Sequence, residues 1–445
     1  MKLTYNVTDR PSIGKTIVFA LQQLLAILAA TIAVPAIIGN GMSQSAALFG
    51  AGVGTIVYLL FTKFRSPVFL GSSFAFLGSM GTAFAGAVSM SVGYLGLLIG
   101  AAFAGLVYVV LAVLVKFVGT GWIDKLMPAV VIGPTVAIIG LSLAGNAVGD
   151  LTGAGYAGIV AGLVTLGVTI ACSVYGKKTI KMIPFIIGIV AGYIVASIFT
   201  GIGAAATNDA LKLVDFSKFE NMQWLPDFTF LKAFSGNYNF GEAGNFGSYL
   251  LTIFVAYVPV AFVVFAEHIA DHKNLSSIIE KDLLKDPGLH RTLLGDGVGS
   301  IAGAFFGGCP NTTYGESVGC VAISGNASVV TILCTAILAI AASFFAPFVT
   351  FLSTIPSCVM GGVCIALYGF IAVSGLKMVQ KVDLEDNRNL FVVSVILIAG
   401  VGGMTLHFGQ VTITEVACAL ILGILTNVLC SIGRKKENQE NKENK

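Results

Sequence analysis

Three carboxylates lie inside apolar stretches of the chain and are the first candidates for chemistry. Glu267 and Asp271 belong to "VFAEHIADH", and Glu316 follows the glycine in "PNTTYGE". A carboxylate is costly to keep in such surroundings, so its presence indicates a function. Because Glu267 and Asp271 are four residues apart, they share one face of a helix. Burial disfavours the ionised form, so such a carboxylate can take up a proton near neutral pH.

Other polar residues in apolar runs are weaker candidates. Gln22 and Gln23 interrupt "LQQLLAILAAT", and we expect one of them to hydrogen-bond towards the site. His268 and His272 frame the turn that carries the acids, and one of them is expected to be solvated. Glu415 has no companion motif and is expected to face a neighbouring helix. No three or four metal ligands converge in the sequence, so no metal site is expected.

The elements that position these residues must be membrane helices. Of 445 residues, 56% are hydrophobic and 11% are charged, whereas soluble proteins carry roughly 25% charged residues. The net charge is +3, and no basic patch with interleaved aromatics indicates a nucleic-acid partner. The polar start "MKLTYNVTDRPSIGK" leads directly into an apolar run, so we expect a mature N-terminus without a cleaved signal.

The cysteines fit the same interpretation. Nearly all of them fall within apolar runs and no CxxC pair occurs, so we expect free, buried thiols that act as small hydrophobic groups. The eight are Cys172, Cys309, Cys320, Cys334, Cys358, Cys364, Cys418 and Cys430.

Apolar runs of about 20 residues predict an all-α polytopic membrane protein with fourteen segments. Basic residues gather in the loops on one side of this arrangement, which marks the cytoplasmic side and places both termini there. A long acidic loop, 201–246, then faces outward. The first seven segments are 17–38, 44–62, 69–86, 91–117, 124–147, 152–175 and 181–200, and the second seven are 247–271, 291–307, 309–325, 326–348, 352–375, 388–404 and 411–432.

Seven segments in each half require the second half to be inverted relative to the first. "MPAVVIG" (127–133) and "IPSCVMG" (355–361) share Pro, Val and Gly at the start of the fifth segment of each half. The third segment of each half is also irregular, in the stretches 66–81 and 307–319. Interrupted segments at corresponding positions of inverted halves point to the central site of a transporter.

The second interruption has a clear local cause. Pro310 lacks an N–H, and with the preceding glycines it disfavours helix before Thr312. Non-helical backbone persists at membrane depth only where it is buried in protein or lines a polar cavity. We expect short helices to begin near 314–316 and 72–74, and the extended residues before them to pair as strands. Two helix N-termini would then point at one place.

These motifs resemble the nucleobase–ascorbate transporter family, and within it the bacterial uracil permease branch. The resemblance is carried along nearly the whole chain by "FAEHIADHKNL", "KDLLKDPGLHRTLLGDGVGS", "GGCPNTTYGESVG" and "FLGSSFAF". It implies a core domain (1–117 and 247–348) that carries substrate past a gate domain (118–200 and 349–432). It also implies dimerisation through the gate, a cytoplasmic tail at 433–445, no cofactor, and a proton as the coupling ion.

The resemblance further implies a set of substrate-binding residues. A Glu at position 316 goes with uracil in this family, whereas Gln goes with xanthine and urate. Glu267 matches the other substrate-binding acid, and coupling is expected at Glu267 and Asp271. The sequence departs from the family at Ser317, at 324–325, at Gln23 and at Asp271. The expected substrate-binding residues are Gln23, Ala30, Ser73, Phe74, Glu267, Tyr314, Gly315 and Glu316.

Uracil chemistry agrees with this set. The base is neutral and offers two N–H donors and two carbonyl acceptors on a flat ring. Carboxylates accept the N–H groups, half-helix N–H groups donate to the carbonyls, and aromatic faces hold the ring. A permease for xanthine or for several nucleobases and a channel remain alternatives, whereas the absence of HExxH, GxSxG and GxGD disfavours an enzyme.

Overall fold

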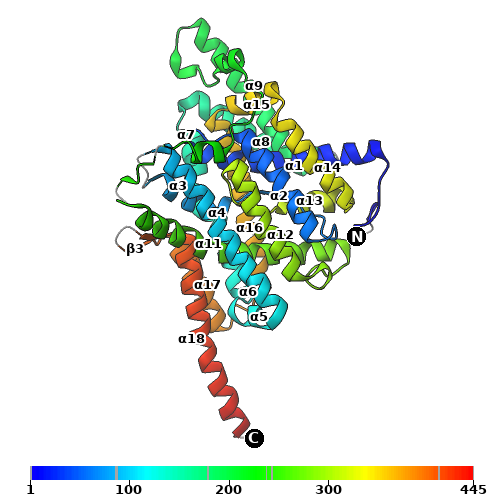
Figure 1. Ribbon diagram of the computed structural model, residues 1–445, viewed down its shortest axis with the longest axis vertical. Helices are drawn as coiled ribbons and strands as arrows, with labels where there is room; N and C mark the ends of the chain where they lie inside the picture. The colour runs from blue at the N-terminus through cyan, green and yellow to red at the C-terminus, as the bar shows by residue number, and fades with distance from the viewer. Residues whose placement is uncertain are drawn as a thin grey trace.

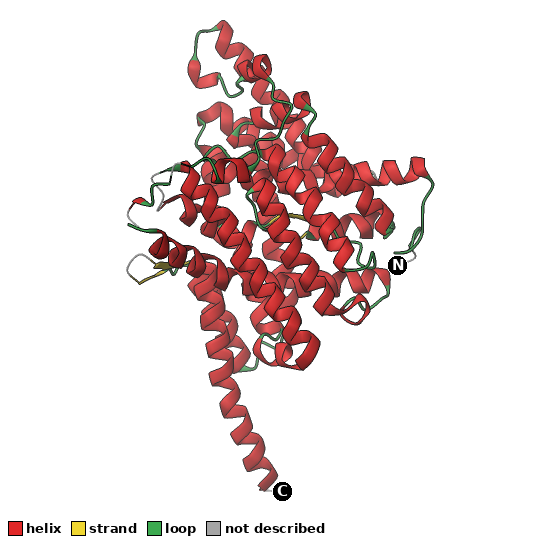
Figure 2. Ribbon diagram, viewed as in Figure 1, coloured by secondary structure: helices red, strands yellow, loops and turns green. Residues whose placement is uncertain are grey.

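The computed structural model describes residues 3–85, 89–177, 180–236, 238–241, 244–408 and 411–443. The protein is mainly helical, with two short strand pairs, one near the centre of the molecule and one at its edge (Figure 2). Within the described ranges, eight helices are long and apolar enough to cross a membrane, or nine if the bent pair Val329–Ser343 and Ala346–Thr354 counts as one. The protein is therefore a multi-pass membrane protein. The predicted segment 69–86, the predicted loop 201–246 and the predicted tail 433–445 include residues 86, 237, 242–243 and 444–445, which lie outside the described residues.

The first half of the chain provides most of the long helices. Its elements are α1 (Ile13–Ile38), α2 (Gln44–Phe61), β1 (Leu70–Ser72), η1 (Phe74–Phe76), α3 (Leu77–Ala85), α4 (Met90–Val118), α5 (Gly121–Leu126), α6 (Ala129–Ser142), α7 (Ala144–Thr152), α8 (Gly155–Tyr175), η2 (Ile180–Met182) and α9 (Pro184–Ala205).

A connection with short helices leads into the second half. It contains η3 (Asp209–Leu211), η4 (Phe216–Asn221) and α10 (Thr229–Ala233). The second half comprises α11 (Phe246–Ile279), η6 (Leu284–Gly288), α12 (Leu289–Gly307), β2 (Asn311–Thr313), α13 (Gly315–Ser324), α14 (Val329–Ser343), α15 (Ala346–Thr354), α16 (Ser357–Val379), α17 (Asn387–Val401), β3 (Leu406–Phe408), β4 (Val411–Ile413) and α18 (Glu415–Glu443).

Most helices lie where apolar segments were predicted, although several ends differ, and two of these differences change the place of an acid. The last predicted segment was to begin at 411, whereas Val411–Ile413 pair as β4 with β3 and the helix begins at Glu415. Glu415 is therefore a half-buried first residue of α18, where the positive end of the helix favours an acid. The eighth segment was to end at 271, whereas α11 continues to Ile279. Asp271 consequently lies within the helix rather than at its end.

The helices pack as two groups. In one group, α12 lies against α2 and α4, α2 against α14, and α11 against α4. In the other, α16 lies against α6, α7 and α8, and α8 against α9. Glycines permit the closest approaches. A Cβ on Gly50 would lie 2.3 Å from the Gly303 carbonyl oxygen, and a Cβ on Gly140 would lie 2.2 Å from that of Tyr368. Close backbone contact of this kind is typical of membrane helices.

The strands predicted at the two interruptions do pair. β1 and β2 are antiparallel, with Leu70 opposite Thr313 and Ser72 opposite Asn311. The N–H of Ser73 donates to the Pro310 carbonyl at 2.9 Å, which continues the pairing. Each strand is followed at once by helix, in η1 and in α13. The interrupted segments of the two halves therefore meet, and their short helices start from one small sheet.

The C-terminal helix α18 projects from the other helices at one end of the molecule, and the connection between α9 and α11 lies at the opposite end (Figure 1). Lys232 ties this connection to the first group of helices. Its ammonium donates to the Gly41 carbonyl at 2.6 Å and pairs with Asp227. Burial lowers the pKa of Lys232, but hydrogen bonds to Asp227 and Tyr94 outweigh burial and raise that pKa above its ordinary value. Lys232 therefore remains charged at neutral pH.

Candidate functional site

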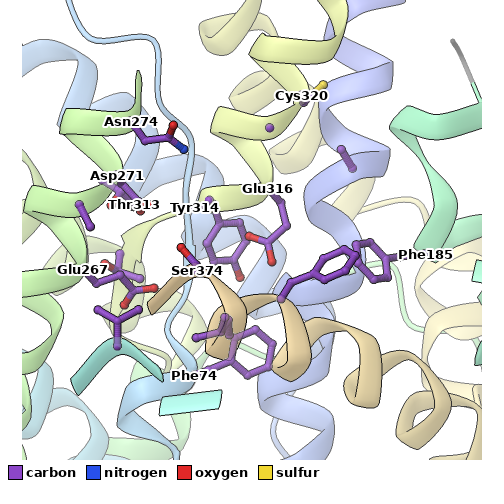
Figure 3. Close-up of a pocket in the computed structure, with 18 of the residues that line it drawn as sticks. Phe74, Phe185, Glu267, Asp271, Asn274, Thr313, Tyr314, Glu316, Cys320 and Ser374 are labelled. Atoms are coloured by element: carbon purple, nitrogen blue, oxygen red, sulfur yellow. Dashed lines mark hydrogen bonds between the residues drawn. The ribbon is translucent and has the colours of Figure 1, made fainter. Parts of the chain in front are cut away.

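A cavity of about 310 Å³ lies where the two groups of helices face each other at the interrupted segments. Glu267 and Phe185 are on opposite sides of it, with Tyr314 and Glu316 between them (Figure 3). The lining residues are Ala26, Ser72, Ser73, Phe74, Val136, Ser173, Lys181, Pro184, Phe185, Glu267, Ala270, Asp271, Asn274, Thr312, Thr313, Tyr314, Gly315, Glu316, Gly319, Cys320, Ile323, Phe370, Ile371 and Ser374.

The three acids singled out in the sequence converge on this cavity. Glu267 and Asp271 reach it from one face of α11, and Glu316 reaches it from the first turn of α13. The Thr313 hydroxyl donates to Asp271 Oδ2 at 2.8 Å and so joins β2 to α11. In the part of the chain that the structure describes, the Glu267 and Glu316 carboxylates make no hydrogen bond to another side chain. These two carboxylates are free to accept hydrogen bonds from a ligand.

The start of α13 supplies hydrogen-bond donors. The first intrahelical bond runs from the Val318 N–H to the Tyr314 carbonyl at 3.2 Å. The N–H groups of residues 315–317 therefore have no backbone carbonyl to donate to within the helix, and that of Glu316 is turned to its own carboxylate. Gly315 is exposed to the cavity, and a Cβ there would meet Asp271 Oδ1 only at 3.8 Å. A ligand carbonyl can approach this backbone closely, at the positive end of the helix.

Aromatic rings and free hydroxyls complete this side. The Tyr314 hydroxyl donates to the Ser72 carbonyl at 2.9 Å, which fixes the ring against β1. Phe74 meets Tyr368 edge to face, with ring centroids 5.4 Å apart. Among the residues that the structure describes, the buried hydroxyls of Ser73 and Thr312 have no hydrogen-bond partner. A flat, polar ligand would find ring surfaces and unpaired hydroxyls together.

Two predicted site residues do not line the cavity. Gln23 is buried and donates to Ser317 Oγ at 2.5 Å, and the same oxygen accepts the Phe69 N–H at 3.1 Å. Gln23 thus joins α1 to α13 and to the residue before β1. Ala30 is fully buried in α1, and Ala26, one turn earlier, lines the cavity instead.

The expectation that one of the two α11 histidines is solvated was wrong, since both are fully buried. His268 Nδ1 lies 2.6 Å from Asp296 Oδ2, and His272 Nε2 lies 2.7 Å from the Tyr58 hydroxyl. The imidazole rings stack with centroids 4.0 Å apart. They do not line the cavity but point into α2 and α12, where their partners Tyr58, Asp296 and Thr292 lie.

The hydrogen-bond partners of His268 determine where the protons of this network lie. Thr292 Oγ1 donates to the Leu289 carbonyl, so it must accept from His268 Nε2 at 3.0 Å. One further proton then lies between His268 Nδ1 and Asp296 Oδ2, whichever atom carries it. The pair is neutral overall, which is the form that burial favours.

Sequence reasoning missed Asp296. It lies in "LLGDGVGS", a glycine-rich stretch quoted above for its resemblance and not for its acid, and it is 1% exposed. The signal was present in the sequence, because Asp296 is a further carboxylate inside an apolar segment. Within the described residues, no three His, Cys, Asp or Glu side chains are grouped as a metal site would require.

Comparisons with known proteins agree with the motifs. A sequence profile described as "Permease family" matches residues 14–409. The uracil permease of Bacillus caldolyticus is 39% identical over 442 residues, which cover 96% of this chain and 95% of the relative. That of Bacillus subtilis (strain 168) is 38% identical over 455 residues, which cover 98% and 97%. Among solved structures, the transmembrane domain of the cyanobacterial bicarbonate transporter BicA matches with a TM-score of 0.63 at 16% identity, over 94% of this chain and 96% of that chain, which indicates a shared fold.

Proposed function

The chain belongs to this permease family, the nucleobase–ascorbate transporters that its motifs resemble, and we propose that it is a uracil permease of the cell membrane. The two Bacillus relatives, which it matches over nearly their whole length, are uracil permeases. The observation that carries the proposal is the convergence of Glu267 and Glu316 on one cavity, beside the free N–H groups at the start of α13.

The cavity offers a partner for each polar group of uracil. The two N–H groups of uracil donate to the Glu267 and Glu316 carboxylates. The carbonyl oxygens of uracil accept from the N–H groups at 315–317 and from the Ser73 hydroxyl. The rings of Phe74 and Tyr314 cover the flat base. Gln23 acts on this site indirectly, because it holds Ser317 and hence the first turn of α13.

Transport is coupled to a proton carried by Glu267, with Asp271 as its relay. A neutral base takes no driving force from the membrane potential, so a cotransported ion must supply it. Glu267 and Asp271 lie one turn apart on α11, and Asp271 is tied through Thr313 to β2. Protonation of Glu267 therefore changes the charge beside the substrate, one helical turn from the acid that is tied to β2.

The chain crosses the membrane fourteen times in two inverted halves, with both termini and the tail 433–445 in the cytoplasm. A core (1–117 and 247–348) moves past a gate (118–200 and 349–432) in an elevator-like step, and the gate also forms a homodimer. The packing of the helices in two groups with the cavity between them supports this division. The paired strands of the two interruptions support the inverted repeat.

Uptake of labelled uracil into vesicles containing the purified protein tests the proposal. A proton gradient should drive accumulation, and an uncoupler should abolish it. Glu316→Ala should weaken uracil binding about 10- to 150-fold, since a hydrogen bond to a charged group contributes about 1.5–3 kcal/mol. Glu415→Gln is the matched control, because Glu415 is also half-buried but does not line the cavity. Unchanged uracil affinity in a folded Glu316→Ala protein would remove Glu316 from the site.

Coupling is tested by measuring binding and uphill uptake separately. Glu267→Gln is permanently neutral, so it should still bind uracil, more weakly, yet fail to concentrate it. Asp271→Asn should slow proton-driven uptake and leave equilibrium binding largely intact. If Glu267→Gln concentrates uracil and an uncoupler collapses the gradient as in the parent, Glu267 is not the coupling residue.

A further inference from the structure

The two sides of the cavity differ in chemistry. The carboxylates, the unpaired hydroxyls and the free N–H groups come from β1, β2, α11 and α13. The facing side, from α6, α9 and α16, is largely apolar, although the hydroxyl and ammonium groups of Ser173, Lys181 and Ser374 also reach it. Its apolar members are Val136, Pro184, Phe185, Phe370 and Ile371.

Phe185 is a buried aromatic member of this apolar side, and its ring packs on the more exposed ring of Phe370. Phe185 is the second residue of α9, directly after Pro184, which begins the helix, and it is 6% exposed. Its ring meets that of Phe370 edge to face, with centroids 5.7 Å apart. Two residues earlier, Ile183 packs against Ala26 of α1 and Cys320 of α13. The start of α9 is thus seated on the elements that carry the polar side.

A uracil ring has only one apolar edge. Four consecutive ring positions, from N1 to C4, carry its N–H groups and carbonyls, and the remaining edge, C5–C6, carries two C–H groups. When the polar positions bond to the acids and to α13, the C5–C6 edge is left to face the apolar side, because burying it there costs no hydrogen bond. Phe185 lies across the cavity from Glu267 (Figure 3).

We propose that Phe185, supported by Phe370, is a specificity-determining residue that contacts the C5–C6 edge of the base. This inference rests on the proposed function. It implies selection of unsubstituted uracil over bases that carry a group on that edge. Thymine has the same N–H and carbonyl groups with a methyl at C5, and xanthine has the same ring with an imidazole fused across C5–C6. Discrimination at this wall is therefore independent of the hydrogen bonds made by Glu316.

Competition binding measures this directly. Unlabelled uracil, thymine and xanthine compete against labelled uracil for the parent, for Phe185→Ala and for Phe185→Leu. One methyl in an apolar pocket changes affinity about 10- to 200-fold. Phe185→Ala should therefore reduce the thymine-to-uracil ratio of inhibition constants about tenfold and also admit xanthine better. Phe185→Leu, which disturbs packing least, should shift the ratio in the same direction by less.

Phe117→Ala is the matched control, since this phenylalanine near the end of α4 is 77% exposed and does not line the cavity. The thymine-to-uracil ratio of inhibition constants for Phe117→Ala should equal that of the parent. A folded Phe185→Ala or Phe185→Leu protein that binds uracil with the parent ratio overturns the inference and leaves the proposed function standing. A parent that binds no pyrimidine overturns both.

Discussion

Gly71→Ala should disorder the site without touching a charged group. Gly71 lies in the middle of β1, opposite Thr312 of β2. A Cβ there would lie 2.3 Å from Cε2 and Cζ of the Tyr314 ring and 2.7 Å from its hydroxyl oxygen. All three distances are far below van der Waals contact, so the tyrosine must move. The hydrogen bond from Tyr314 to the Ser72 carbonyl, 2.9 Å in length, would be lost with it.

The size of the effect follows from that geometry. Adding a methyl group to a closely packed interior costs about 1–3 kcal/mol. If displacement of the ring makes the free energy of uracil binding less favourable by the same amount, uracil affinity falls about 5- to 150-fold, at 1.4 kcal/mol per factor of ten. Thermal stability should fall as well, because a buried carbonyl loses its donor.

Equilibrium uracil binding and a thermal melt, both on purified protein, measure the two effects. Gly81→Ala in α3 is the control, since no atom lies within 4 Å of a Cβ built there. In the double variant with Tyr314→Ala the clash disappears, so the two changes should cost less together than the sum of each alone. Parent-like uracil affinity in Gly71→Ala, or strict additivity in the double variant, would refute the reasoning.

Further substitutions test three contacts outside the cavity, those of Asp296, Ser317 and Lys232. Asp296→Asn should keep a hydrogen bond to His268 and near-parent stability, whereas Asp296→Ala should lower the melting temperature, because an unpaired buried group costs about 1–3 kcal/mol. Ser317→Ala removes the acceptor of Gln23 and should lower both stability and uracil affinity, and adding Gln23→Leu should recover part of the loss, which a double-mutant cycle measures. Lys232→Met should lower the melting temperature, whereas Lys212→Met should not, since the Asp209 partner of Lys212 is 90% exposed.

The interrupted helices could be predicted because their causes are local. Pro310 cannot donate a hydrogen bond, and Gly308, with a φ of 77°, adopts a left-handed conformation that ends α12. Both properties belong to the residue itself, so the sequence reveals them. The common direction of the two α11 acids could be predicted for a similar reason, since a four-residue spacing places Glu267 and Asp271 on one helical face.

The errors arose where a distant partner decides the outcome. Whether His268 is solvated depends on Asp296, 28 residues away, and on the packing of α11 against α12. The extension of α11 to Ile279 and the replacement of predicted helix by β4 also depend on neighbours. The β-branched run "VTIT" (411–414) forms strand because Leu406–Phe408 lie beside it. Periodicity alone does not contain this information.

The buried histidines explain how α11 can present two acids accurately to the cavity. One side of the helix is tied to β2 through Asp271 and Thr313. Its other side is tied to α12 through His268 and to α2 through His272. Adjacent residues of a helix point about 100° apart around its axis. A rotation of α11 about its axis by even part of that angle would turn the Glu267 carboxylate away from the cavity. Ties on both sides oppose that rotation. The position of the cavity-facing acid Glu267 therefore depends on polar groups that do not line the cavity.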